Sequence, residues 1–279
     1  MHSSDSYFHC RENKINAGPF LKWAGGKRWL VGEQDDWLPS RFNRYFEPFL
    51  GGGSVFFAVQ PLRAFLSDSN KELIETYEAI RDCPSEVWKE LIKLGQNHSA
   101  EHFYSVRSRS PGSLIARAAR FLYLNRTCWN GLYRVNSQGQ FNVPIGSKTS
   151  VVLAGDDFEA VSSLLKSARL SCRDFSNAIS FSRSGDFVYC DPPYTVKHEN
   201  NGFVKYNEKI FTWSDQERLA SSLDRADKRG VLFAVSNAKH KSIIDLYARY
   251  KIREVNRASI ISGQAKGRGT YPEVLITNY

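Results

Sequence analysis

The chain has 279 residues, of which 42% are hydrophobic and 24% are charged. This length and composition are typical of one or two globular domains and exclude a mainly disordered or collagen-like chain. Lysine and arginine number 38 against 29 aspartate and glutamate, which gives a net charge of +9. The excess of cations favours a polyanionic partner, with nucleic acid as the first candidate.

The five cysteines are widely spaced and form no C-x-x-C pair. They therefore indicate neither a disulfide framework nor a zinc ribbon, and we interpret them as reduced thiols. Residues 1–14 are polar, and no apolar run approaches the ~18 residues that a membrane span requires. We expect a cytoplasmic protein that does not contact a membrane.

Short runs rich in β-branched and aromatic residues predict mostly buried strands. They are Tyr45–Leu50, Ala64–Leu66, Arg169–Phe175, Phe187–Cys190, Val231–Ser236, Lys251–Val255 and Val274–Tyr279. Helical patterns lie between several of them, at Glu159–Ala168, from Ser214 onward, and at Lys241–Tyr250. Ser214 and Glu217 have the spacing of a capping box. Strands that alternate with crossover helices predict an α/β fold with a doubly wound, mostly parallel sheet.

The stretch from Asn70 to about Ser150 breaks this alternation, because its apolar residues recur at helical spacing. We interpret it as a helical insertion. From His102 to Ser150 it has no Asp or Glu, and its cations are Arg107, Arg109, Arg117, Arg120, Arg126, Arg134 and Lys148. A solvated basic face is the usual meaning of such a run. Interleaved aromatic residues favour a nucleic-acid surface instead, because phosphates attract cations and unstacked bases pack on aromatic rings.

A glycine-rich turn follows the strand at Tyr45, in the run that ends Gly51-Gly52-Gly53-Ser54. Asp68 ends the next strand, where an acid can accept hydrogen bonds from ribose hydroxyls. The two features imply an adenosine-containing ligand, although a plain structural turn explains the glycines equally well. Phe56 interrupts the G-x-G-x-x-G spacing, which disfavours a pyrophosphate ligand.

The run Lys22–Lys27 superficially resembles a phosphate-binding P-loop. Leu21 and Arg28 stand where a P-loop requires Gly and Ser or Thr, so this interpretation fails. What remains is either a plain loop or a turn with two cations and an indole, suited to a carboxylate-bearing or aromatic ligand.

The buried strand that begins near Asp186 ends in Asp191-Pro192-Pro193-Tyr194. The prolines stiffen the turn and remove two donors, which leaves carbonyls as acceptors beside the carboxylate. A rigid pair of acceptors under an aromatic ring is what the exocyclic amine of a flipped base requires. The alternative is a structural turn, but acceptors without matching donors would close a strand poorly.

Together these motifs resemble the Dam family of DNA adenine methyltransferases. The similar segments occur in the family's order and are Phe20–Lys27, Phe46–Ser54, Asp68–Asn70, Leu122–Arg126, Asn130–Leu132, Phe141–Pro144 and Asp191–Tyr194. The resemblance extends to the segment Glu273–Tyr279. It implies a class I methyltransferase fold in which residues 1–69 and 151–279 form the catalytic domain. Residues 70–150 would form a helical target-recognition domain.

The resemblance implies transfer of a methyl group from S-adenosylmethionine to the N6 amine of a flipped adenine in double-stranded DNA. Asp191 and the Pro192 carbonyl would hold the amine, Pro193 would complete the turn, and Tyr194 would stack on the base. The sulfonium supplies the electrophile, so we expect no metal. The implied cofactor-binding residues are Trp23, Lys27, Glu47, Pro48, Phe49, Gly51, Gly53, Ser54, Asp68, Phe175 and Asp191.

The same resemblance assigns a set of DNA-binding residues in the insertion and the first motif. They are Lys22, Arg126, Trp129, Asn130, Leu132, Arg134, Pro144 and Lys148. Trp129 would wedge into the duplex, Arg134 can read a guanine edge, and Leu132 and Pro144 can contact a thymine methyl. These positions match those that contact bases in GATC-specific members of the family, so the resemblance implies GATC as the recognition sequence. The chain departs from them at Cys128, where they often have Gly, and at Ser147, where they often have a basic residue.

Two alternatives differ from this interpretation, the first in functional class and the second in the target of methylation. A non-catalytic DNA-binding regulator on this scaffold is disfavoured by the intact turn Asp191–Tyr194. A cytosine-N4 or RNA methyltransferase of the same fold would grip its amine with the same turn, but the insertion matches adenine enzymes. We expect the protein to act as a monomer.

Overall fold

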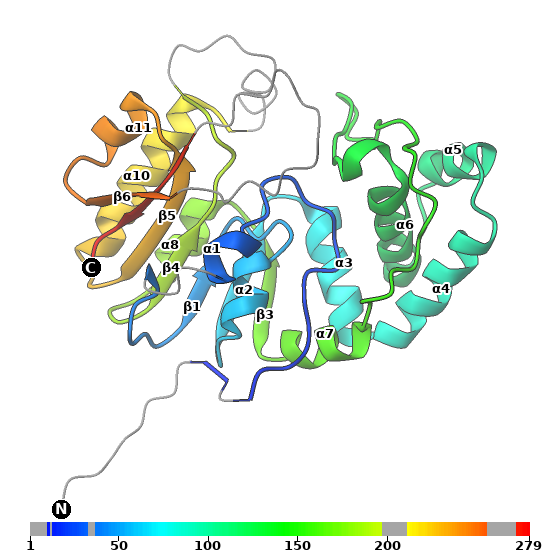
Figure 1. Cartoon of the computed structure of the whole chain (residues 1–279), viewed down its shortest axis with the longest axis horizontal. Helices are drawn as coiled ribbons and strands as arrows, with labels where there is room; N and C mark the ends of the chain where they lie inside the picture. The colour runs from blue at the N-terminus through cyan, green and yellow to red at the C-terminus, as the bar shows by residue number, and fades with distance from the viewer. Residues whose placement is uncertain (1–9, 12, 33–36, 197–210, 256–271) are drawn as a thin grey trace, which may run out of the picture.

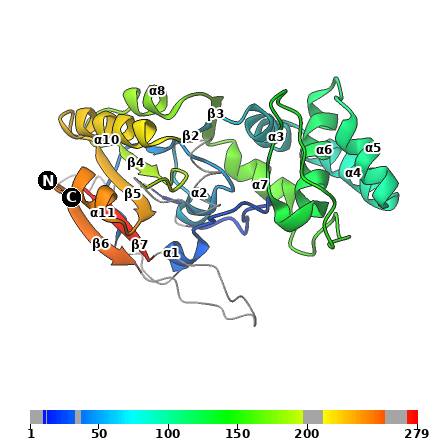
Figure 2. The same cartoon turned by 90° about the horizontal axis from the view of Figure 1, so that it is seen from above.

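The computed structural model describes residues 10–11, 13–32, 37–196, 211–255 and 272–279. A sheet flanked by helices occupies one end of the molecule, and α4, α5 and α6 occupy the other (Figure 1). The view from above shows the same separation along the long axis (Figure 2). Within the described ranges, no helix has the length and apolar character needed to cross a membrane.

The sheet has seven strands in the order β3-β2-β1-β4-β5-β7-β6. They are β1 (Tyr45–Glu47), β2 (Ala64–Asp68), β3 (Ala168–Cys172), β4 (Phe187–Cys190), β5 (Leu232–Ala238), β6 (Lys251–Val255) and β7 (Glu273–Thr277). The pairs among β1 to β5 are parallel, whereas β7 runs antiparallel to β5 and β6. The α/β, doubly wound, mostly parallel sheet predicted from the sequence is therefore confirmed.

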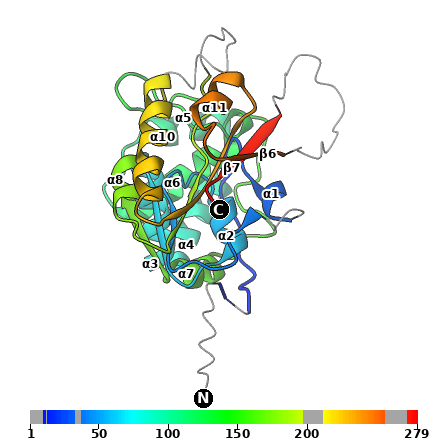
Figure 3. The same ribbon diagram turned by 90° about the vertical axis from the view of Figure 1, so that its left-hand side faces the viewer.

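The helices connect these strands and build the insertion. They are α1 (Arg28–Gly32), α2 (Ser54–Val59), α3 (Lys71–Asp82), α4 (Pro84–Gln96), α5 (Ala100–Ser108), α6 (Leu114–Thr127), η2 (Trp129–Gly131), α7 (Phe158–Leu165), α8 (Phe175–Ser180), α10 (Trp213–Asp227) and α11 (Lys241–Leu246). Figure 3 shows α8 and α10 on one side of the sheet and α1 and α2 on the other.

The core has two layers because side chains alternate across each strand. In β4, Phe187 and Tyr189 pack into the layer that contains α1, α2, α3 and α7. Val188 and Cys190 face the opposite way and pack with α8, α10 and α11. Both faces of the sheet are thus covered, which explains why the central strands read as continuous apolar runs rather than alternating ones.

Several predicted boundaries differ from those in the structure, and two of the differences have a clear local cause. The third strand ends at Cys172 rather than Phe175, because the Asp174 side chain accepts a hydrogen bond from Ser176 N and starts α8. The capping box lies two residues earlier than predicted: Thr212 and Asp215 bond reciprocally, so α10 starts at Trp213. The sequence S/T-x-x-acid occurs at both places, and the structure uses the first.

The insertion lies inside the single crossover that joins β2 to β3. Its first helix, α3, packs against β2, β3, α6 and α7, and so belongs partly to the layer that covers the sheet. Helices α4 and α5 pack on α6, farther from the sheet. The whole insertion is therefore a long loop of the sheet, held to it through α3 and α7.

Candidate active site and DNA-binding face

Three carboxylates gather at the carboxyl edge of the sheet. Glu47 ends β1, Asp68 ends β2, and Asp191 directly follows β4. The strand order reverses between β1 and β4, because β1 continues to β2 on one side and β4 to β5 on the other. Open α/β sheets bind their ligands in the crevice at such a switch point.

The glycine turn between β1 and α2 is held from both sides. A Cβ at Gly51, which has φ +46°, would lie 2.7 Å from the Trp23 indole. The Gly51 amide donates to Asp68 Oδ2 at 3.0 Å, and Asn70 N donates to Asp68 Oδ1 at 2.9 Å. Glycine is thus required at position 51 by the close approach of Trp23, and Asp68 fixes the turn through its bond to Gly51 N.

The remaining residues of the predicted cofactor set lie around this turn. Gly53, with φ +65°, precedes α2 and leaves no room for a side chain beside Tyr77. Ser54 lies against Gly26, so the first motif touches the second. Pro48 is buried and Phe49 is half-buried. The structure therefore brings together two motifs that the sequence separates by more than twenty positions.

Glu47 is buried at the centre of the edge and is 3% exposed. Its carboxylate accepts a hydrogen bond from Tyr45 Oη at 2.8 Å. Burial, together with the charge of Asp191, raises the pKa of Glu47 to about 8. Burial also raises the pKa of Asp68, although backbone hydrogen bonds oppose the rise. Carboxylates that resist ionisation in this way are stabilised by an arriving cation.

The turn Asp191–Tyr194 is tied to its surroundings by an ionic cluster. Asp191 Oδ1 accepts from Ser236 Oγ at 2.8 Å, and Asp191 Oδ2 lies 3.0 Å from Lys27 Nζ. Lys27 Nζ is also 3.5 Å from Glu273 Oε2, which accepts from Tyr194 Oη at 2.7 Å. The Lys27 side chain, expected to line the cofactor pocket, therefore points at the turn Asp191–Tyr194.

The prolines of this turn differ in accessibility. Pro192 is buried and Pro193 is half-buried. The Pro193 carbonyl lies 3.5 Å from Gln216 Nε2, the outer limit of a hydrogen bond. Gln216 is itself held by Asn237. The Gln216 side chain of α10 thus contacts the turn at Pro193, whereas Lys27 contacts it at Asp191.

Phe175, a cofactor-binding residue by the resemblance, is covered by its neighbours in the fold. It is 5% exposed, its ring stacks on Phe49 at 5.2 Å, and the Arg218 guanidinium lies 4.1 Å from the ring centroid. An adenine reaches the ring of Phe175 only if Phe49 or Arg218 moves.

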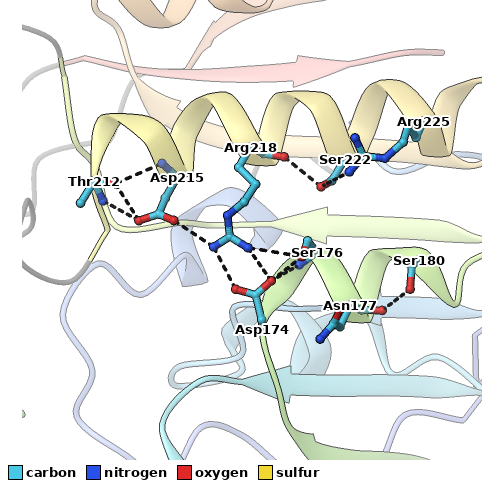
Figure 4. A network of polar contacts seen from close by, with 9 residues as sticks. All are labelled: Asp174, Ser176, Asn177, Ser180, Thr212, Asp215, Arg218, Ser222 and Arg225. Atoms are coloured by element: carbon cyan, nitrogen blue, oxygen red, sulfur yellow. Dashed lines mark hydrogen bonds and ion pairs between the residues drawn. The ribbon is translucent and has the colours of Figure 1, made fainter.

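A polar network beside Phe175 joins α8 to α10 (Figure 4). Arg218 binds both oxygens of Asp174, at 2.7 and 2.9 Å, and Asp215 at 2.9 Å. Although burial opposes it, hydrogen bonds from Arg218 and Ser176 lower the pKa of Asp174 to about 2. Sequence reasoning missed Asp174, and its position directly before Phe175 was the available signal.

The exposed face of the insertion carries most of the predicted DNA-binding residues. Trp129 is 56% exposed and Leu132 is 38% exposed. Trp129 N donates to the Pro144 carbonyl at 2.9 Å, which holds two parts of this loop together. The other exposed members of the predicted set are Asn130, Arg134, Pro144 and Lys148. These exposed side chains all belong to residues 128–148, a segment that we call the recognition loop.

Arg126 was wrongly assigned to DNA. Its side chain is fully buried and binds both oxygens of Asp156, one of them at 2.7 Å. It also donates to the Val151 and Phe20 carbonyls. A guanidinium with these partners lies in the interior and does not reach a nucleic acid, so Arg126 is a structural residue.

Other cations of the acid-free segment are also paired. Arg117 binds Glu75 at 2.8 Å, and Arg120 lies 3.3 Å from Glu72. Both acids lie on α3, outside the acid-free segment. The positive charge of this segment is therefore partly neutralised in the fold, and the cations exposed on the recognition loop are Arg134 and Lys148.

Lys22 and Trp23 connect the first motif to the insertion. The Asn125 side chain accepts from Lys22 N at 2.8 Å and donates to the Lys22 carbonyl at 2.7 Å. Lys22 Nζ donates to the Arg126 carbonyl at 2.8 Å, and burial followed by the charge of Arg126 lowers the pKa of Lys22. Trp23 stacks on Tyr133 of the recognition loop. One short segment thus contacts both the glycine turn and the recognition loop.

Comparison with known proteins is consistent with this arrangement. Residues 23–261 match the family model of D12 class N6 adenine-specific DNA methyltransferases. The chain is 36% identical to the type II methyltransferase M1.LlaDCHI of Lactococcus lactis subsp. cremoris, over 96% of this chain and 98% of that protein. It is 34% identical to the type II methyltransferase M.MjaIII of Methanocaldococcus jannaschii, over 94% of this chain and 99% of that protein. It is 31% identical to the DNA adenine methylase of Escherichia coli, over 92% of this chain and 93% of that protein.

Proposed function

Because the chain belongs to the D12 class of N6 adenine-specific DNA methyltransferases, we propose that it methylates an adenine flipped out of double-stranded DNA, with S-adenosylmethionine as donor. The observation that carries this proposal is the position of Asp191. Its carboxylate stands at the switch point of the sheet, beside Glu47 and the glycine turn. A donor held at the turn and an amine held at Asp191 would then be neighbours.

The residues at the edge fit S-adenosylmethionine. In the part of the chain that the structure describes, Glu47, Asp68, Asp191 and Glu273 gather with one ammonium, that of Lys27. This excess of acids suits a ligand that carries a sulfonium and an ammonium group. The Asp68 carboxylate accepts backbone hydrogen bonds from Gly51, Ser69 and Asn70 and retains acceptor capacity, so this side chain can also accept from ribose hydroxyls.

The catalytic turn would hold the target amine through the Asp191 carboxylate and the Pro192 carbonyl. The sulfonium supplies the methyl group, so the chain needs to position the amine rather than form a covalent intermediate. Asp191 acts as an acceptor that localises the lone pair of the amine and not as a strong base. A base inside the duplex is out of reach of such a turn, which is why the proposal includes base flipping and stacking on Tyr194.

The recognition loop would read the DNA sequence. Trp129 would enter the duplex, Lys148 would contact phosphate, and Arg134 would bind a guanine edge. Leu132 and Pro144 would contact a thymine methyl, and Lys22 would reach the DNA after leaving the Arg126 carbonyl. We propose GATC as the site and a monomer as the active species, which fits a single insertion that carries these groups together with Lys22 beside it.

The test is methyl transfer by the purified protein from S-adenosylmethionine with a tritiated methyl group. Duplexes that contain GATC and all its single-base variants are the substrates, and product nucleosides are identified by chromatography. We expect N6-methyladenine, and at least tenfold faster transfer on GATC than on the variants. N4-methylcytosine would overturn the target base, a different preferred site would overturn GATC, and label only in single strands would overturn the duplex substrate.

A further inference from the structure

We propose that Glu273 is a positioning residue for methyl transfer, which orients Tyr194 through its hydroxyl and receives Lys27 when the target amine displaces that lysine from Asp191. The inference rests on the roles proposed above for Asp191 and Tyr194. It adds a residue from the far end of the described chain to a site otherwise built from strands β1, β2 and β4.

The topology of β7 explains why Glu273 reaches this site. Glu273 is the first residue of β7 and pairs with Ala238, the last residue of β5. Because β7 runs antiparallel to β5, its amino end lies at the edge where the parallel strands end. A strand parallel to β5 would place its first residue at the opposite edge.

The contacts of Glu273 link two groups that the reaction needs. Glu273 Oε2 accepts from Tyr194 Oη at 2.7 Å and lies 3.5 Å from Lys27 Nζ. Lys27 Nζ lies 4.9 Å from the centroid of the Tyr194 ring. The tyrosine is therefore fixed at its hydroxyl by the carboxylate, and its ring is contacted by the ammonium.

Lys27 and the target amine compete for Asp191. Lys27 is almost fully buried, and its ammonium faces Asp191 Oδ2 at 3.0 Å, the Gly25 carbonyl at 2.8 Å and Glu273 at 3.5 Å. An amine that approaches Asp191 Oδ2 from the side that faces Lys27 displaces this ammonium. A buried ammonium without a counter-charge is strongly unfavourable, and Glu273 supplies that counter-charge within the same cluster.

Two substitutions separate the contributions of Glu273. Glu273→Gln keeps an oxygen that accepts from Tyr194 Oη but removes the charge that receives Lys27. Glu273→Ala removes both. Tyr194→Phe removes the hydroxyl and leaves the ring. The double variant Glu273→Ala with Tyr194→Phe therefore shows whether Glu273 acts through Tyr194. The control is Glu254→Gln on β6, an exposed carboxylate paired with Lys239.

Single-turnover rates and the KM for duplex DNA are measured for these variants, with thermal melting to verify folding. We expect Glu273→Ala to slow transfer on the order of 100-fold, the scale of a misplaced reacting group, with KM changed less than about threefold. Glu273→Gln should slow transfer about tenfold, and Glu254→Gln should match the wild type. When Tyr194→Phe is already present, the factor by which Glu273→Ala slows transfer should be at least about fivefold smaller than in the wild type.

Equal costs of Glu273→Ala with and without the Tyr194 hydroxyl would overturn the orienting role. A wild-type rate for Glu273→Gln would overturn the transfer of Lys27, and this isosteric variant remains informative if Glu273→Ala does not fold. These ratios hold for whichever base the wild type methylates. Failure of the proposed target base therefore appears in the wild-type product, and failure of the Glu273 proposal appears in the variants.

Discussion

The sheet edge and the recognition loop hold their functional side chains in opposite ways. At the edge, Lys27, Asp191 and Glu47 are paired with other side chains before any ligand arrives. On the loop, Trp129 and Arg134 are exposed to solvent, and the Arg134 side chain donates only to Asn142, to Oδ1 at 2.8 Å and to the carbonyl at 3.4 Å, among the hydrogen bonds of the described residues. Chemistry needs acceptors that are fixed in advance, whereas recognition needs a surface that the partner can cover. Substitutions should therefore change the rate at the edge and the choice of DNA at the loop.

The largest effect is expected at Asp191. Asp191→Ala should reduce methyl transfer at least on the order of 1000-fold, because it removes a fixed acceptor where charge develops on the amine. Binding of S-adenosylmethionine and of DNA, measured by calorimetry and anisotropy, should stay within about tenfold. Asp245→Asn, an exposed carboxylate of α11 paired with Lys241, serves as the control. Near-wild-type transfer by Asp191→Ala would show that the active site lies elsewhere.

The buried cation of the insertion should matter for folding. Arg126→Ala should lower the free energy of unfolding by about 3–5 kcal/mol, because Asp156 would remain buried without its partner. Urea denaturation measures this loss. Lys93→Ala, which breaks an exposed pair with Glu90, should cost less than about 1 kcal/mol. If Arg126→Ala instead kept its stability and lost only DNA affinity, the structural assignment of Arg126 would be wrong.

A selective effect is expected at Arg134. Arg134→Ala should cost about 1–3 kcal/mol on the preferred site and relax discrimination at one base pair, as expected for a lost guanine contact. Lys148→Ala is the matched control on the same loop. Loss of a phosphate contact should weaken all sequences alike and reduce the salt dependence of binding by about one ion. Uniform weakening by Arg134→Ala would place its guanidinium at phosphate.

The effect expected at Glu47 is spread over several pH units and is the smallest per pH unit. Its pKa of about 8 in the folded protein exceeds the ordinary value of 4.5, so the folded state retains a proton that the unfolded state releases. Stability should therefore fall as pH rises from about 5 to 8, at a slope on the order of 1 kcal/mol per pH unit, and level off above that range. Glu47→Gln should flatten this part of the profile in urea denaturation. If the slope of stability against pH were unchanged in Glu47→Gln, titratable groups other than Glu47 would be its cause.

The local sequence pattern predicted the sheet and most of the residues at its carboxyl edge. The strands, the glycine turn, Asp68 and the turn at Asp191 each lie within a few residues of chain, where alternation, glycine and proline have direct local consequences. The pairings of Arg126 and Glu273 depend instead on contacts between distant segments. Asp156 is 30 positions from Arg126, and Glu273 is 79 positions from Tyr194. A count of charges along the acid-free segment cannot show which arginines meet acids on α3.

The position of the insertion inside the crossover from β2 to β3 bears on how specificity can be exchanged between relatives. A segment that leaves and re-enters the same crossover can be replaced without altering the strand order. The clamp of Asn125 on Lys22 and the pair of Arg126 with Asp156 set the boundary of such a graft. A transplanted recognition segment should begin after Arg126 and end before Val151. Longer transplants would need to carry their own partners for the sheet domain, and shorter ones would divide the loop that joins Trp129 to Pro144.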